Sequence, residues 1–221
     1  MVHIDQQEIR FLSQNQVREA GALHMRECID RMELVVELYN QKKVVMGENG
    51  QDLHGHMTTF PSGLSDPERS RLRSGSRFGA MPAYVGGKID TVGVKWYGSV
   101  TPRPEEINAP WSGPLILLSD PDSGRPMAIM DGEIISSMRT GAMAALGAKH
   151  IHPDPEVVTI LGPGAIGQTS AMAMDTTFSS INKMRIYHPN IQKSKLFRTK
   201  MDEKLDVHIN EHEDLERAVK D

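Results

Sequence analysis

The stretch Leu-Gly-Pro-Gly-Ala-Ile-Gly at residues 161–167 decides the fold of this chain. It follows an apolar run at residues 157–161 and opens a helical pattern, which is the order of a phosphate-binding strand–turn–helix. In such a turn Gly162 permits the tight bend, Gly164 lets the backbone approach a pyrophosphate, and Gly167 lets helix and strand pack closely. The sequence therefore predicts a dinucleotide-binding turn, with a tight turn without a ligand as the alternative.

The residues around this turn predict the rest of its domain. The helix that starts with Ala165 and Ile166 offers free N–H groups and a positive dipole end to the phosphates. We expect strands at 157–161, 183–187 and 207–209, and helices at 165–178, 190–204 and 213–220. Their alternation predicts a parallel sheet of order 3-2-1, which is one half of a Rossmann domain. Because only residues 168–221 follow the turn, we expect this domain to be incomplete.

Residues 1–131 have a different character. A helical pattern covers residues 13–43, with Gly21 as a break between a short and a long helix. Short β-like runs follow at 44–46, 53–60, 77–85, 92–100, 115–118 and 127–130, with long loops expected at 62–76 and 101–113. The pattern predicts an α/β protein: an α+β domain at 1–131, a connecting helix within 132–152, and the Rossmann half at 153–221.

The bulk composition excludes several classes of protein. With 221 residues, 38% hydrophobic and 24% charged, the chain has the composition of a globular protein. A net charge of −4 gives no electrostatic reason to expect nucleic acid or an anionic membrane as a partner. The single cysteine, Cys28, lies in an apolar helical pattern and is expected to be buried. No leader or membrane-spanning stretch is visible, so we expect a cytoplasmic protein.

The end of the second expected strand bears on the choice of cofactor. NAD-binding domains usually place an acidic residue there to accept from the ribose 2′-OH, and this chain has none. Lys193 and Lys195 follow and could meet a 2′-phosphate, so both NAD and NADP remain open. His188 and Asn190 are candidate cofactor contacts, although either could instead cap the next helix.

Two cations are candidate carboxylate ligands. Arg139 interrupts a helix of small and apolar residues, where a guanidinium needs a carboxylate from a substrate or from a neighbouring acid. Lys95 shares one face of a β-prone run with Gly93 and Tyr97. Three interpretations of it are open: a carboxylate ligand, a group that transfers a proton, and a solvated lysine on a strand. His54 and His56 would share a strand face, but no third ligand follows at metal-binding spacing, so we expect no metal site.

Several segments, in their order along the chain, resemble the ornithine cyclodeaminase/mu-crystallin family. They are Met81–Tyr84, Gly93–Trp96, Leu118–Asp120 with Ser123–Pro126, Asp131-Gly132, Arg139–Ala142 and Gly162–Gly167. The resemblance implies a homodimer in which the domain at 1–131 is the substrate-binding and dimerisation domain, taking a small amino-acid or imino-acid substrate, and the Rossmann domain binds NAD or NADP. It assigns Lys95 and Arg139 to the substrate α-carboxylate, with Lys95 also catalytic, and Thr140 to the cofactor.

The family resemblance leaves the reaction open among three alternatives. The first is ornithine cyclodeamination to proline and ammonia, the second is an amino-acid dehydrogenase or imine reductase, and the third is an inactive NAD(P)H-binding protein. The family's Pro-x-Arg is replaced here by residues 45–49, and His56 is a candidate substitute for its arginine. The family's acidic general acid/base is expected beyond Asp221.

Overall fold

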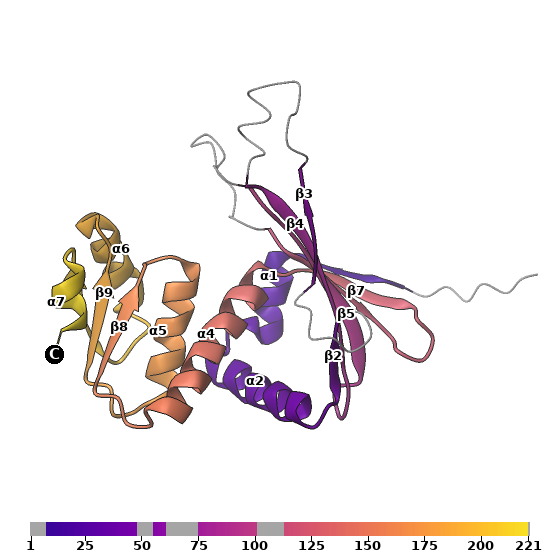
Figure 1. Ribbon diagram of the computed structural model, residues 1–221, viewed down its shortest axis with the longest axis horizontal. Coiled ribbons are helices and arrows are strands. Elements are labelled where there is room, and N and C mark those ends of the chain that lie inside the picture. The colour runs from indigo at the N-terminus through magenta and orange to yellow at the C-terminus, as the bar shows by residue number, and fades with distance from the viewer. Residues whose placement is uncertain (1–7, 48–54, 61–74, 101–112, 221) are drawn as a thin grey trace, which may run out of the picture. The chain divides into compact units, whose positions relative to one another are not determined.

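The computed structural model describes residues 8–47, 55–60, 75–100 and 113–220. The chain divides into two compact units, residues 1–20 with 35–134 and residues 21–34 with 135–221 (Figure 1). The second unit thus includes residues 21–34, which the division proposed from the sequence placed in the first domain. Most of the two expected long loops and His54 lie outside the described residues.

The first unit is built on a seven-stranded sheet. Its strands are β1 (Arg10–Leu12), β2 (Val44–Met46), β3 (His56–Thr59), β4 (Arg77–Val85), β5 (Thr91–Ser99), β6 (Leu115–Ser119) and β7 (Pro126–Asp131). The order is β1-β7-β6-β5-β4-β2, and β3 pairs with β4 beside this path. Among the described strands of this unit, only the β1–β7 pair is parallel. Short connections at residues 86–90 and 120–125 join the antiparallel pairs β4–β5 and β6–β7.

The expected helix at 13–43 is divided more finely than the sequence indicates. Helix α1 (Gln14–Val17) begins at a capping box formed by Ser13 and Gln16, and a π-helical turn, η1 (Arg18–Ala22), follows it. Gly21 takes φ 96° inside that turn, which confirms the predicted break, and α2 (Met25–Asn40) starts after it. Strand β1 was not predicted, because three residues are too few to show an alternating pattern.

The second unit confirms the predicted Rossmann-type half-sheet. Its elements are α4 (Glu133–Ile151), β8 (Val157–Leu161), α5 (Ala165–Thr177), β9 (Lys183–Tyr187), α6 (Ile191–Met201), β10 (His208–His212) and α7 (Leu215–Val219). The strands form a parallel sheet in the order β10-β9-β8, which is the expected order 3-2-1. Because each crossover carries a helix, all three strands end at the same edge, where the turn at 161–167 lies.

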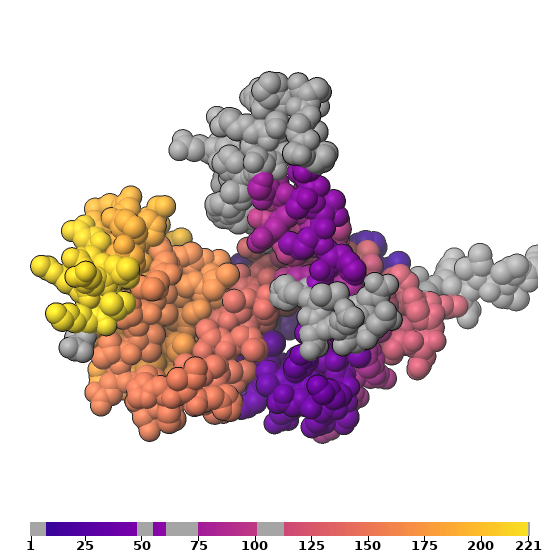
Figure 2. All heavy atoms as spheres, viewed as in Figure 1, coloured from indigo at the N-terminus to yellow at the C-terminus, as the bar shows by residue number. Residues whose placement is uncertain are grey.

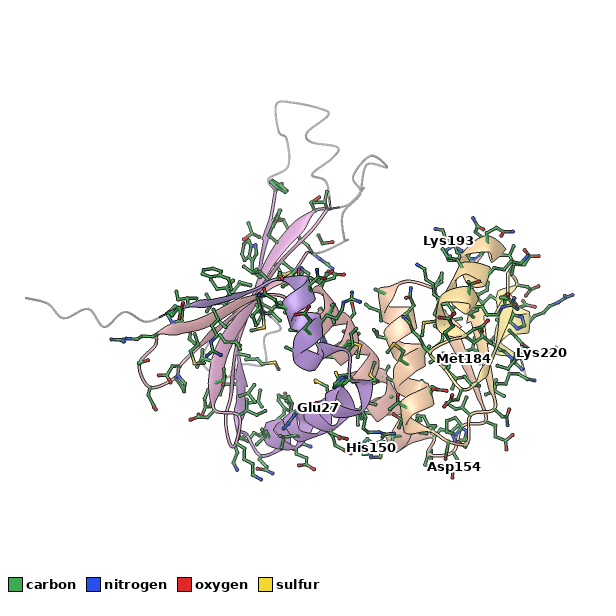
Figure 3. All side chains as sticks on the ribbon, turned by 180° about the vertical axis from the view of Figure 1, so that it is seen from behind. Glu27, His150, Asp154, Met184, Lys193 and Lys220 are labelled. Atoms are coloured by element: carbon green, nitrogen blue, oxygen red, sulfur yellow. The ribbon has the colours of Figure 1, made fainter. Side chains whose placement is uncertain are left out.

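The core of this unit lies on one face of the half-sheet. Met184 and Ile186 of β9 are fully buried, together with Phe197 and Met201 of α6. Figure 3 places Met184 inside the unit, and the side chains of the unit close into one packed body in Figure 2. Helix α7 contacts the opposite face, where Arg185 donates to the carbonyls of its last turn.

The first turns of α2 belong to this unit through polar contacts. The Arg26 guanidinium donates to the Thr176 carbonyl at the end of α5. The Lys149 ammonium of α4 lies 3.0 Å from a Glu33 carboxylate oxygen. These side chains explain why residues 21–34 associate with α4 and α5 although they are distant in sequence. No helix among the described residues combines the length and hydropathy needed to cross a bilayer.

Candidate functional site

The three glycines of the turn have three different environments. Gly162 takes φ 109°, a left-handed conformation that favours glycine, and its N–H donates to the Tyr187 carbonyl at 3.1 Å. Gly164 caps α5, and a Cβ placed on it would meet nothing within 4 Å. A Cβ on Gly167 would lie 2.0 Å from the Gly162 carbonyl oxygen. The turn therefore needs glycine at 162 for its backbone conformation and glycine at 167 because a side chain would clash with the backbone. At Gly164 the surrounding space is open.

The start of α5 presents unused backbone donors. The first N–H to bond back into the helix is that of Gln168, which donates to the Gly164 carbonyl at 3.0 Å. The amides of Ala165, Ile166 and Gly167 precede it and find no acceptor among the described residues. Gly164, Ala165 and Ile166 are exposed. Open space in front of these donors fits a pyrophosphate group held by a helix N-terminus.

The end of β9 lies beside this turn and carries the two candidate residues of the second strand. The His188 ring accepts the Asn190 N–H on Nδ1 at 2.9 Å, which leaves Nε2 to carry the proton of the neutral ring. The Asn190 Oδ1 accepts the Gln192 N–H at 3.0 Å and caps α6. The capping alternative is thus confirmed for Asn190, and cofactor contact by either side chain stays a prediction. Lys193 lies on the outside of the first turn of α6 (Figure 3).

Arg139 and Thr140 lie on α4 in the same unit as the turn. Arg139 is half-buried and forms no hydrogen bond or ion pair with the described part of the chain. Of the two alternatives from the sequence, pairing with a neighbouring acid therefore finds no support there, and an external carboxylate fits better. The Thr140 hydroxyl donates to the Ser136 carbonyl at 2.7 Å, so its oxygen is left as an acceptor.

Lys95 lies in the first unit, in the middle of β5. It is half-buried, and its ammonium lies 5.0 Å from the ring centroid of Tyr97 on the same face. Its cross-strand neighbours are Met81 on β4 and Ile116 on β6. A cation above an aromatic ring and between apolar neighbours is less solvated than a lysine on an open surface. This setting supports the carboxylate-binding interpretation over a fully solvated lysine.

His56 does not lie on the Lys95 face. It pairs with Ala80 across β3 and β4, and Ala80 pairs with Trp96, which alternates with Lys95. The histidine therefore projects from the other face of the sheet, so it is a poor substitute for an arginine that binds the same carboxylate as Lys95. No cluster of three metal-ligating side chains occurs in the ranges that the structure describes.

Two features of this region have no counterpart in the sequence-based prediction. Gly141 abuts the backbone of α5, and Thr169 of α5 bonds to α4, a contact between segments about thirty residues apart that no local pattern reveals. At the start of α4, burial raises the pKa of the Glu133 carboxyl, and the charge of Asp131 raises it further. The periodicity of the sequence does not distinguish Glu133, with its raised pKa, from other acidic residues of a helix.

Comparison with known proteins gives one family and consistent relatives. The model of the ornithine cyclodeaminase/mu-crystallin family matches residues 24–221. The N-((2S)-2-amino-2-carboxyethyl)-L-glutamate dehydrogenase of Staphylococcus aureus is 29% identical over 181 residues, which are 81% of this chain and 50% of that protein. The chain thus spans about half the length of the curated relatives that it matches.

Solved structures share the fold. The Δ1-pyrroline-2-carboxylate reductase of Thermococcus litoralis, in complex with NADH and L-proline, superposes with a TM-score of 0.80 at 23% identity, covering 96% of this chain and 59% of that one. An archaeal alanine dehydrogenase dimer with bound NAD gives a TM-score of 0.76 at 23% identity, covering 95% of this chain and 57% of that one. At this level of identity the likeness establishes the fold.

Proposed function

The chain belongs to the ornithine cyclodeaminase/mu-crystallin family, and on this premise we propose that it serves as a nicotinamide-dependent oxidoreductase of small amino and imino acids. The observation that most directly supports this proposal is the turn at 162–167, where free amides face open space at Gly164. When bound, NAD(H) or NADP(H) supplies or accepts a hydride at the substrate α-carbon. The chain's own residues hold the phosphates and fix the substrate.

We assign the substrate carboxylate to two cations. Arg139 offers a planar fork that matches a carboxylate in two hydrogen bonds, and it has no competing partner among the described residues. Lys95 provides a second positive charge from the sheet and is our candidate for proton transfer to or from the substrate. The amides of Ala165 to Gly167 bind the phosphates, while Thr140, His188 and Asn190 are proposed as further cofactor contacts.

Among the reactions of this family, net reduction of an imino acid or oxidation of an amino acid is the one we propose. The relatives and neighbours described above are named as dehydrogenases and a reductase. Ornithine cyclodeamination has weaker support, because the cyclodeaminases among the solved structures of this fold match at a TM-score of 0.69 and at 15% and 19% identity. The proposal therefore departs from cyclodeaminase activity, the first of the three alternatives considered from the sequence.

The assay that tests this proposal separates the three alternatives. Purified protein is given NADH or NADPH with Δ1-pyrroline-2-carboxylate, and in parallel NAD with L-ornithine. We expect reduced cofactor to be consumed in proportion to the proline formed. Proline and ammonia from ornithine without net cofactor change would identify a cyclodeaminase, and cofactor binding without turnover of a panel of imino acids would identify a binding protein.

Variants test the assigned cations in the same assay. We expect Arg139→Gln to lower kcat/KM by roughly tenfold to a hundredfold, because a charge-assisted bidentate contact with the substrate is lost. The matched control is Arg198→Gln, because the Arg198 guanidinium already pairs with Glu211, with 3.0 Å between nitrogen and carboxylate oxygen. Equal effects of the two substitutions would contradict the assignment of Arg139.

We further propose that the protein pairs with a second copy through the sheet of the first unit. Five exposed large apolar side chains of this sheet share one face, as the strand register shows, and we call this the apolar face. Exposed Met57 of β3 lies on the other face. The members of the apolar face are Phe11 (69% exposed), Trp96 (48%), Leu115 (44%), Val45 (40%) and Val92 (38%). Contiguous exposed apolar surface of this kind marks an association site.

The occupant that we propose for the apolar face is the same face of a second chain. Two such sheets stack face to face at about 10 Å and bury their apolar side chains against each other. The archaeal alanine dehydrogenase with the same fold is a dimer. A two-fold pairing would make the interface self-complementary, as is usual in homodimers.

A further inference from the structure

Helices α4 and α5 come into close contact at Gly141 and Thr169, near Arg139 on the first helix and after the phosphate turn on the second. A Cβ on Gly141 would lie 2.4 Å from the Thr169 carbonyl carbon and 2.5 Å from its oxygen, so the α4 helix meets the α5 backbone there. Gly141 and Ala142 are buried. Glycine is therefore required at this crossing by distance, because any side chain would push the helices apart.

The Thr169 hydroxyl bonds across the same contact. It donates to the Ser137 carbonyl of α4 at 2.8 Å, while its own-helix carbonyls at Ala165 and Ile166 are at 3.2 and 3.1 Å. Other helical threonines of this chain behave differently: Thr176 and Thr177 bond to the carbonyl four residues earlier at 2.7 Å. The hydroxyl of Thr169 thus makes its shortest hydrogen bond to the neighbouring helix and two longer ones to its own.

The position of this contact gives it a functional meaning. Along α4, Ser137 and Gly141 flank Arg139, and each lies about 3 Å of helix rise from it. Along α5, Thr169 lies one turn, about 6 Å of rise, after Ala165 at the phosphate turn. A slide of one turn between the helices, about 5.4 Å, would break the Thr169–Ser137 bond.

We propose that Gly141 and Thr169 form an interhelical lock that fixes Arg139 relative to the phosphate turn, which makes Thr169 a positioning residue. Both helices are rigid over several turns, so one close contact and one directed hydrogen bond fix their separation and their register. The inference rests on the proposed function, because it takes Arg139 as the substrate ligand. Thr169 itself is buried, with 9% of its surface exposed, and acts through α4.

The test compares Thr169→Val, which replaces the hydroxyl by a methyl of similar size, with Thr169→Ser, which keeps the hydroxyl. The first measurement is hydrogen exchange of the α4 peptide, residues 133–151, in the NADH-free protein. We expect exchange about tenfold faster in Thr169→Val and within about twofold of wild type in Thr169→Ser, because loss of the bond makes opening of the contact easier by roughly the 1.4 kcal/mol that a tenfold change represents. Unchanged exchange in Thr169→Val would overturn the lock, whatever the protein catalyses.

The second measurement is kinetic and uses the imino-acid assay. We expect Thr169→Val to lower kcat about tenfold with the NADH dissociation constant within about threefold of wild type, and Thr169→Ser to restore kcat. Faster exchange in Thr169→Val without loss of kcat would mean that the contact is only structural, and it would overturn the positioning role of Thr169. A wild-type protein without turnover contradicts the proposed function instead, and the exchange comparison then decides the lock.

A glycine pair within α4 provides a second test. Gly141→Ala introduces a Cβ into the helix contact, whereas Gly147→Ala introduces one where nothing lies within 4 Å. We expect Gly147→Ala to keep wild-type kcat and to melt at or slightly above the wild-type Tm, because alanine has the higher helix propensity. Gly141→Ala should speed α4 exchange in the same way as Thr169→Val, and equal behaviour of the two glycine variants would count against the lock.

Discussion

At the scale of single residues, the phosphate turn separates the uses of glycine. Gly162 needs its left-handed backbone, and Gly167 needs the absence of a side chain because a Cβ would lie 2.0 Å from a carbonyl oxygen. Gly164 meets neither demand, since its backbone is extended and the space around it is open. Only a ligand would make a side chain at Gly164 costly, so this position reports binding without reporting folding.

This difference predicts opposite behaviour for two alanine variants. Gly164→Ala should fold with a Tm close to wild type and bind NADH at least about tenfold more weakly, because the methyl occupies the space in front of the free amides. Gly167→Ala should lose about 1–3 kcal/mol of stability, because the turn must move to admit the Cβ. Thermal melts and fluorescence titration with NADH measure both. NADH affinity in Gly164→Ala equal to wild type would contradict the assigned phosphate site.

The sequence was sufficient for these residues because the information is local. A strand, three spaced glycines and a helix lie within about twenty residues, so their order predicts the geometry of the turn. The pairing of Thr169 with Ser137 was beyond sequence reasoning, because it depends on how two helices cross. The face on which His56 lies was equally hidden, because it is fixed by the register between β3 and β4.

At the scale of elements, short and irregular pieces were the ones that the sequence missed. Strand β1 and the π-helical turn η1 each span too few residues to establish a period. The alternating strands and helices of the second unit were predicted in kind and order, since each runs long enough for its apolar face to be recognised. Tertiary contacts explain the rest: Arg26 and Glu33 attach the first turns of α2 to the second unit.

The end of α5 carries a pH-dependent contact. Burial raises the pKa of the Asp175 carboxyl above its usual value, and the charge of Asp206 adds to this, although a backbone hydrogen bond from Asp206 opposes it. The folded state therefore favours the protonated carboxyl. The resulting stability is present at acidic pH, below the pKa of the unfolded chain, and is lost as the pH rises through the folded pKa.

This predicts that Asp175→Asn stabilises the protein at neutral pH. The amide removes the charge and keeps an acceptor for the Asp206 N–H, so we expect Tm to rise by about 1–2 °C at about pH 7. The gain should shrink as the pH falls, because the wild-type carboxyl then takes up its proton. Melting curves from neutral to acidic pH measure this. Asp154→Asn, an exposed position with the same change in net charge, should show no such trend, and an equal trend there would contradict the local explanation.

At the scale of the whole molecule, the apolar face of the first unit predicts the state of association. We expect the wild-type chain to sediment as a dimer. Leu115→Lys combined with Val92→Lys should shift it toward the monomer, because charges on two neighbouring strands would be buried in the interface. Sedimentation velocity measures the shift. The control is Leu196→Lys on α6 of the second unit, where the side chain is 55% exposed. A double variant that stays a dimer, or a control that becomes a monomer, would contradict the proposed interface.

The buried guanidinium of Arg185 also governs how the second unit melts. It donates to the Lys220 carbonyl at 2.8 Å and to the Ala218 carbonyl, while the Thr159 hydroxyl of β8 donates to the same Ala218 carbonyl at 2.8 Å. A helix of five residues has little stability in isolation. Detaching α7 alone would break the three hydrogen bonds from Arg185 and Thr159 together, so fraying from that end is costly. The last helix and the central strand therefore melt as one cooperative block.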